Sequence, residues 1–205
     1  MGMDKGYRRE RKQDYFYRRA KELKLRSRAA FKLGQLDDRY NLLRRGDVVV
    51  DLGAAPGGWL QVAREKVGGE GFVLGVDLQQ IAKLPHPNVK TLVADITDPS
   101  TPELIRQNIP RPADVVLSDA SPKISGVWSV DHSRSIELAS AVLTIAENVL
   151  TQGGKLLIKV FQGELFQEFM GEIRKKFEFV KISKPLASRK GSAEVYVIAK
   201  GFRSP

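Results

Sequence analysis

The 205-residue sequence contains no cysteine and only two histidines, His86 and His132. The lack of cysteine excludes disulfide bonds, thiolate metal sites and a cysteine nucleophile. With so few histidines a histidine-rich metal site is not expected, so we predict no bound metal. No apolar run approaches the length of a membrane span, and the basic start lacks the apolar segment of a signal peptide. We therefore expect a cytoplasmic protein that makes no use of a membrane.

Positive charge is abundant and concentrated at the two ends of the chain. The net charge is +10; residues 1–45 contain 15 Lys and Arg against six Asp and Glu, and residues 181–205 contain six against one. Basic ends around a slightly acidic middle favour a polyanionic partner, most simply RNA. Two solvated basic faces that only maintain solubility are the alternative. We expect a basic N-terminal arm or helix over residues 1–25, followed by a single domain over 26–205 that is monomeric.

Short apolar β-branched runs alternate with helical patterns from residue 47 onward. This alternation predicts an α/β fold with a mostly parallel sheet and helices on both faces. A helix over 27–40, capped by Ser27, precedes the first strand. The last two strands, at about 177–185 and 193–201, are expected to pair antiparallel. The predicted strands between them are 47–52, 71–78, 89–95, 113–119 and 153–161, and the predicted helices are 57–67, 102–109, 133–150 and 163–177.

Chemically useful residues stand near the ends of these predicted strands. A glycine-rich turn, "DLGAAPGGW" (51–59), follows the first strand; Asp77, Asp95 and Asp119 end the next three, and Lys159 lies near the end of the fifth. Ligands of open α/β sheets bind at the carboxyl ends of the strands, so these residues predict one shared site. The alternative is a loop glycine cluster with solvated aspartates.

The glycine-rich turn does not match the dinucleotide fingerprint Gly-x-Gly-x-x-Gly, because Ala55 occupies the position of the second glycine. That turn binds a pyrophosphate in dehydrogenases, and no additional anion-binding group is evident here. A carboxylate after the second strand, Asp77, is well placed to accept hydrogen bonds from ribose hydroxyls. A nucleoside-like cofactor without phosphate, S-adenosylmethionine, fits these features better than NAD.

Five segments, "RSRAAFKL", "DLGAAPGGW", "SDASPKISG", "KVFQGE" and "SAEVYVIAKG", occur in this order from about Ser27 to Gly201. In them the chain resembles the FtsJ/RrmJ family of RNA ribose 2′-O-methyltransferases. The resemblance implies a Rossmann-like methyltransferase fold, with a seven-stranded, mostly parallel sheet and one antiparallel strand. It also implies a catalytic tetrad of Lys32, Asp119, Lys159 and Glu194. The family's S-adenosylmethionine contacts correspond to Gly57, Trp59, Asp77, Asp95 and Asp119.

The resemblance further implies methylation of a ribose in RNA, and the expected target is a uridine in the A loop of large-subunit ribosomal RNA. Alternatives are a tRNA anticodon-loop enzyme, a cap enzyme, or an RNA-binding ribosome-assembly protein. The chain departs from the family pattern at Ser121-Pro122-Lys123, where Ala-Pro-Asn is common. This segment borders the substrate side, so the departure concerns the RNA target and leaves the chemistry unchanged.

Taken singly, several of these residues have simpler interpretations. Lys159 could extend its amine into water from a strand end, and Lys32 and Glu194 could be solvated surface residues. Trp59 could be a packing residue at a helix start, although we expect it also to form a wall of the adenosine pocket. Trp128 and His132 could contact RNA or pack within their loop. The order and number of the matching segments favour the catalytic assignment for the two lysines and for Glu194.

Overall fold

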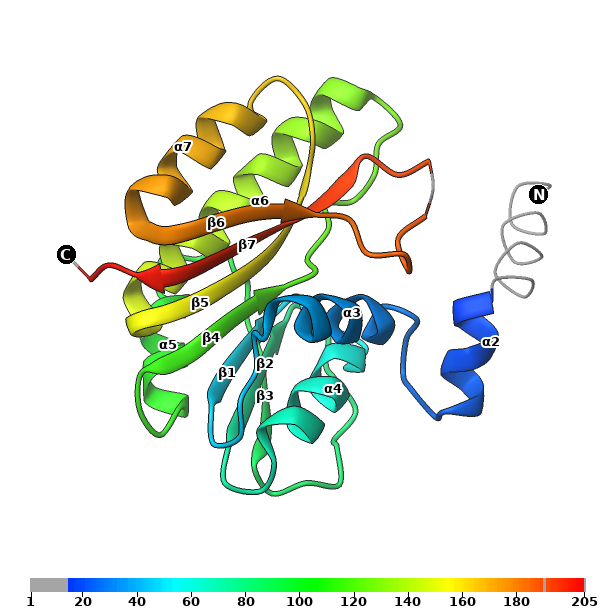
Figure 1. Ribbon diagram of the computed structural model, residues 1–205, viewed down its shortest axis with the longest axis vertical. Helices are drawn as coiled ribbons and strands as arrows, with labels where there is room; N and C mark the ends of the chain where they lie inside the picture. The colour runs from blue at the N-terminus through cyan, green and yellow to red at the C-terminus, as the bar shows by residue number, and fades with distance from the viewer. Residues whose placement is uncertain (1–14, 190, 205) are drawn as a thin grey trace.

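A computed structural model describes residues 15–189 and 191–204 (Figure 1). Seven strands form one sheet: β1 (Val48–Leu52), β2 (Phe72–Asp77), β3 (Val89–Val93), β4 (Ala113–Ser118), β5 (Leu150–Phe161), β6 (Phe177–Ser183) and β7 (Glu194–Phe202). The helices are α2 (Tyr15–Glu22), α3 (Ala30–Tyr40), α4 (Gly58–Val67), α5 (Thr101–Asn108), α6 (Trp128–Val149) and α7 (Phe166–Lys176).

The strand order is β3-β2-β1-β4-β5-β7-β6. β7 runs antiparallel to both β5 and β6, and the other neighbouring strands are parallel. The predicted seven-stranded, mostly parallel sheet with one antiparallel strand is therefore confirmed. The strand order reverses between β1 and β4, and the crevice beyond the carboxyl ends of these strands is where open sheets of this kind bind ligands.

Side chains alternate between the two faces of the sheet and fill two hydrophobic cores. On β1, Val48, Val50 and Leu52 point into the core covered by α5, α6 and α7, whereas Val49 points into the core covered by α3 and α4. The helices lie on both faces of the sheet (Figure 1). Because strands buried on both faces have no solvent side, they read as continuous apolar runs in the sequence.

Several predicted boundaries were wrong, among them the starts of α3 and α6. α3 begins at Ala30, and Ser27 does not cap it, since the N-cap residue Ala29 has no side-chain cap hydrogen bond. The Ser27 hydroxyl instead packs against Gly58, where a β-carbon would lie 2.2 Å from it. α6 begins at Trp128 rather than at residue 133, because the Asp131 carboxylate accepts hydrogen bonds from the turn just before the helix and stabilises an earlier start.

The predicted basic segment 1–25 is described in part. α2 lies at the edge of the molecule beside the start of α3, with the Phe16 ring centroid 5.4 Å from that of Phe31 (Figure 1). Residues 1–14, with their arginines and Lys12, lie outside the described residues. Within the described part of the chain, no helix has the length and apolar character needed to span a membrane, and no group of three or more potential metal ligands gathers.

Candidate active site

The four residues that the family resemblance selects meet in one cluster. The Lys32 ammonium lies 2.8 Å from a carboxylate oxygen of Glu194 and 3.8 Å from Oδ1 of Asp119. The Lys159 ammonium lies 3.3 Å from the same Asp119 oxygen and donates a 2.8 Å hydrogen bond to the Asp119 backbone carbonyl. Two ammonium groups and two carboxylates are therefore in mutual contact, and Asp119 touches both lysines.

Four different elements bring these side chains together. Lys32 is in the first turn of α3, Asp119 follows β4, Lys159 is on β5, and Glu194 begins β7. β5 lies between β4 and β7, and the antiparallel register places Lys159 opposite Tyr196 and Phe161 opposite Glu194. Pairing of β5 with β7 thus fixes the distance between Lys159 and Glu194, which no local sequence signal determines.

The cluster is largely removed from water, and its charges balance. Lys32 and Lys159 are each 9% exposed, so their ammonium groups would be costly to bury without partners. Burial raises the pKa of Glu194, but the charge of Lys32 and its hydrogen bond, together with Lys159 and Ser188, outweigh burial and leave that pKa below its usual value. Glu194 is therefore ionised at neutral pH and neutralises Lys32.

Tyr196 is a fifth member of the cluster that the sequence reasoning missed. Its hydroxyl donates a 2.6 Å hydrogen bond to Oδ1 of Asp119, and its ring lies 5.5 Å from the Lys32 ammonium. Burial and the nearby Asp119 and Glu194 carboxylates raise the pKa of Tyr196 well above its usual value, so the hydroxyl keeps its proton. A signal was available, because residues two apart on a strand share a face and Tyr196 follows Glu194 by two.

A first cavity, of about 330 Å³, opens at the carboxyl ends of β1, β2 and β4. Asp77, Asp95 and Asp119, three of the predicted cofactor residues, line it. Asp77 accepts hydrogen bonds from the backbone N–H groups of Ala55 (2.9 Å) and Gln79 (2.8 Å), which fixes the orientation of its carboxylate. The walls carry three carboxylates and no Lys or Arg, so the cavity suits a ligand with hydroxyl donors and positive charge.

The Asp95 carboxylate is fixed in a similar way by the residues that follow it. It accepts hydrogen bonds from the Thr97 hydroxyl (2.7 Å) and backbone N–H (2.8 Å), and these bonds lower the pKa of Asp95. Asp98 makes the same pair of bonds with Ser100 but does not line the cavity. The turns at Asp95 and Asp98 thus have the same hydrogen bonds, but only the Asp95 carboxylate can reach a ligand in the first cavity.

Asp51, at the end of β1, is a second residue that the sequence reasoning did not select. It is 1% exposed, and neither carboxyl oxygen has a hydrogen-bond partner among the described residues. Burial, together with the charges of Asp119 and Asp77, raises the pKa of Asp51 well above its usual value. The raised pKa favours the protonated acid, a form that adds no negative charge to those of Asp77 and Asp119.

The predicted roles of Gly57 and Trp59 find less support in the geometry. Neither residue lines the first cavity. Gly57 has a φ of +102°, a conformation that glycine adopts readily, and a β-carbon there would meet the Arg26 side chain. Trp59 is 3% exposed, donates a 2.8 Å hydrogen bond to the Ala29 carbonyl, and packs against Tyr196. The structure gives Trp59 a packing role next to the cluster; its contact with a cofactor stays a prediction.

A second cavity, of about 590 Å³, lies on the other side of the cluster. Lys32 and Glu194 form part of its wall, and Ser121 lines both this cavity and the first one. Arg28 and Arg189 also line the second cavity. Arg26 does not, since its guanidinium donates to the Pro56, Ala82 and Lys83 carbonyls. Lys190 lies outside the described residues.

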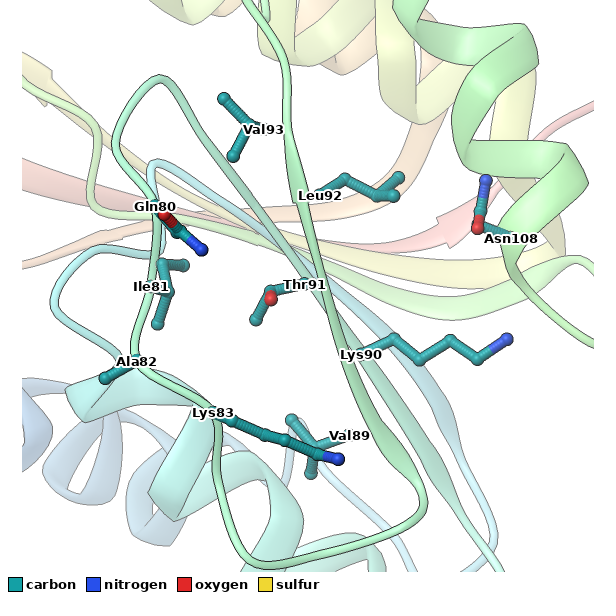
Figure 2. Close-up of a pocket in the computed structure, with 10 residues that line it drawn as sticks. All are labelled: Gln80, Ile81, Ala82, Lys83, Val89, Lys90, Thr91, Leu92, Val93 and Asn108. Atoms are coloured by element: carbon teal, nitrogen blue, oxygen red, sulfur yellow. The ribbon is translucent and has the colours of Figure 1, made fainter.

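A third cavity, of about 620 Å³, runs along the edge strand β3. Figure 2 shows Thr91 facing the segment 80–83, whereas Lys90 and Leu92 point to the opposite side of the strand. No carboxylate lines this cavity, and none of the predicted site residues does. The charged cluster and the three cavity aspartates therefore lie away from this cavity.

Known proteins are similar to this chain in sequence and in fold. The family model for FtsJ-like methyltransferases matches residues 25–202. The chain belongs to the FtsJ-like methyltransferase family. It is 49% identical over 202 residues to ribosomal RNA large subunit methyltransferase E of Methanocaldococcus jannaschii, covering 97% of this chain and 82% of that protein. With the enzyme of the same name from Methanothermobacter thermautotrophicus the identity is 48%, covering 98% and 95%.

A solved structure also resembles the methyltransferase. A Plasmodium falciparum protein described as a ribosomal RNA methyltransferase superposes with a TM-score of 0.77 and 27% identity, covering 88% of this chain and all of the other. A methyltransferase requires a methyl donor. The carboxylates of the first cavity offer hydrogen-bond acceptors and negative charge to a ligand.

Proposed function

We propose that the protein transfers a methyl group from S-adenosylmethionine to the 2′-oxygen of a ribose in large-subunit ribosomal RNA, with a uridine of the A loop as the target. One observation carries the proposal. Asp119 lines the first cavity and Lys32 and Glu194 line the second, so the charged cluster stands between them. A donor in the first cavity and a ribose in the second would both reach the same side chains.

S-adenosylmethionine fits the acid-lined cavity because its ribose supplies hydroxyl donors and its sulfonium and amino groups are cationic. Asp77 and Asp95 would hold the adenosine part, and Asp119 would lie near the sulfonium side. When bound, this cofactor supplies a methyl group from its sulfonium. Loss of the methyl group leaves the rest of the cofactor as a neutral thioether. An anionic dinucleotide would place phosphates against three carboxylates and is disfavoured.

The side chains of the cluster would prepare the ribose hydroxyl. A ribose 2′-hydroxyl is a weak nucleophile at neutral pH and needs an acceptor within hydrogen-bond reach. Lys159, whose amine is fixed by two Asp119 oxygens, would orient the hydroxyl. After releasing its own proton to solvent, the neutral Lys159 amine would accept the hydroxyl proton as the oxygen becomes methylated. Lys32 and Glu194, at the wall of the second cavity, would hold the sugar. Tyr196 keeps Asp119 in position through its hydroxyl.

RNA as the substrate is supported by charge and by the relatives. Arg28 and Arg189 line the second cavity, next to where a ribose would lie, and can neutralise the adjoining phosphates. α2 adds Arg18, Arg19 and Lys21 at the N-terminal edge of the molecule. Contacts of this kind position an RNA strand without reading its sequence. The named large-subunit specificity of the homologous enzymes supports ribosomal RNA over other RNAs.

Mapping of ribose methylation on total RNA from cells with and without the gene tests the proposal. We expect one large-subunit site to lose its methyl group when the gene is absent and to regain it when the gene is restored. Loss of a methyl group from the tRNA anticodon loop would instead identify a tRNA enzyme. An unchanged methylation pattern would reject the enzymatic proposal and favour an RNA-binding assembly protein.

The target particle can be tested with purified protein and labelled S-adenosylmethionine. We expect transfer to large subunits isolated from cells that lack the gene, and no transfer to free tRNA. The matched control is the same type of particle from cells that contain the gene, which should accept little label because its site is already methylated. Equal transfer to both preparations would contradict the proposed target.

A further inference from the structure

The segment that leads into α6 carries an unusual amount of exposed apolar surface. Ile124 is 59% exposed, Val127 56% and Trp128 51%. Single exposed apolar residues are ordinary, but several within five residues mark an interaction surface. Because Ile124 also lines the second cavity, this surface begins at the wall of that cavity and extends outward. Ile124, Val127 and Trp128 together are called the apolar platform below.

The platform is fixed by hydrogen bonds to one buried residue. Asp131 is 5% exposed, and its carboxylate accepts hydrogen bonds from the Ser125 backbone N–H (2.7 Å), the Ser125 hydroxyl (2.7 Å) and the Gly126 backbone N–H (3.1 Å). The first of these bonds is the main reason that the pKa of Asp131 lies below its usual value. Gly126 has a φ of +88°, which the turn requires and which glycine tolerates. These bonds fix the backbone of the turn that carries the exposed side chains.

The Trp128 ring continues a stack that starts at the charged cluster. Its plane lies 18° from that of Phe161, with centroids 6.2 Å apart, and 17° from that of His132, with centroids 5.8 Å apart. These values are typical of offset parallel rings. Phe161 pairs with Glu194 in the sheet and lines the second cavity. A half-exposed indole thus lies one aromatic ring away from the wall of the cavity that would hold the ribose.

We propose that the apolar platform, with Trp128 at its centre, stacks on an unpaired base of the RNA next to the ribose that is methylated. The proposal rests on the function proposed above and names a contact that would position its substrate. Charge supports RNA as the occupant, since Arg28, Lys32 and Arg189 line the cavity from which the platform extends. A flat indole beside a cationic cavity matches a base beside its phosphates.

Stacking on Trp128 also answers a need of the reaction. A ribose that enters a cavity has to leave the regular stack of its RNA strand, which exposes the face of a neighbouring base. Aromatic side chains replace the lost stacking in single-stranded RNA complexes, with little preference for the identity of the base. The platform would therefore stabilise the opened strand and leave the choice of target to other contacts.

Fluorescence can follow the contact directly, because the chain has two tryptophans and only one of them is accessible. Trp59 is 3% exposed and Trp128 51%, so acrylamide quenching of the native protein reports on Trp128. The probe is a large-subunit RNA fragment that contains the A loop. We expect saturating fragment to quench the fluorescence of Trp128 and to protect its remaining fluorescence from acrylamide. Unchanged acrylamide quenching with the fragment bound would overturn the proposal.

Substitutions then measure the contribution of the ring. We expect Trp128→Ala to weaken binding of the naked fragment by about 5- to 150-fold, and Trp128→Phe to lose less because it keeps a ring. Val93→Ala is the matched control, because Val93 is an exposed apolar residue (63%) on the far edge strand β3, and this variant should bind as the wild type does. Unchanged thermal unfolding and S-adenosylmethionine affinity would show that Trp128→Ala is folded. If Trp128→Ala does not fold, the affinity of Trp128→Phe for the fragment, compared with that of wild type, tests the stacking contact.

The outcomes separate this inference from the proposed function. Normal methyl transfer with a Trp128→Ala affinity within about twofold of wild type would overturn the stacking contact and leave the proposed function intact. Tight, Trp128-dependent RNA binding without any transfer would support stacking and reject the proposed function. Weakened binding to ribosomal particles with unchanged binding to the naked fragment would assign the platform to a ribosomal protein and overturn the proposal.

Discussion

The Lys159 ammonium is bound twice by one residue, Asp119, through its backbone carbonyl at 2.8 Å and its carboxylate at 3.3 Å. This pairing explains why a lysine is tolerated between Ile158 and Val160, which are both buried. It also fixes the amine at the carboxyl end of the sheet, between the two cavities. A snorkelling lysine would instead place its ammonium in water, and at 9% exposure Lys159 does not.

Replacement of Lys159 tests its role in the chemistry. We expect Lys159→Ala to lower methyl transfer by at least about 100-fold, because the ribose hydroxyl loses its acceptor. S-adenosylmethionine affinity should stay near the wild-type value, since Lys159 does not line the first cavity. Single-turnover transfer assays and calorimetric titration measure the two quantities. Wild-type turnover in the variant would remove Lys159 from the mechanism.

Tyr196→Phe tests whether the hydrogen bond to Asp119 positions the cluster. The ring and its packing against Trp59 are kept, while the 2.6 Å bond to the carboxylate is lost. A bond to a charged acceptor contributes about 1.5–3 kcal/mol, so we expect a roughly tenfold or greater fall in kcat with little change in KM for RNA. A change in KM alone would point to RNA binding, and no change in either constant would leave Tyr196 with a packing role.

Asp95 and Asp98 form a matched pair for testing the cofactor cavity. Each carboxylate accepts the same two hydrogen bonds within its own turn, but only Asp95 lines the cavity. We expect Asp95→Ala to raise the Kd for S-adenosylmethionine about tenfold, and Asp98→Ala to leave it unchanged. Isothermal titration of both variants measures this difference. Equal effects of the two substitutions would mean that the cofactor binds elsewhere.

Asp51 predicts a pH dependence of stability with a definite sign. Its pKa is raised in the folded protein, so the folded state keeps a proton that the unfolded chain loses above about pH 3.8. The contribution of Asp51 to the free energy of unfolding is therefore largest below that pH, and it falls as pH rises toward the folded pKa. We expect the free energy of unfolding of Asp51→Asn relative to wild type to increase as pH rises from about 4 toward the folded pKa of Asp51. Denaturant unfolding across this range measures the gain, and a difference independent of pH would contradict the assignment.

Much of the fold could be predicted because each central strand is buried on both faces and reads as an apolar run. The sequence motifs likewise selected Lys32, Asp119, Lys159 and Glu194, which the structure brings together. What could not be predicted depends on contacts between distant segments. The Ser27 hydroxyl packs on Gly58 rather than capping α3. The Trp59 indole donates a hydrogen bond to the Ala29 carbonyl, and Trp59 does not line the first cavity.

The central claim is that the charged cluster directs a methyl group to a ribose oxygen. The most direct measurement is nucleoside analysis of large-subunit RNA after incubation with the protein and labelled S-adenosylmethionine. We predict that the label appears in a single 2′-O-methylated nucleoside, a uridine, and disappears with Lys159→Ala. Label on a base, or label on ribose that persists in Lys159→Ala, would contradict the account.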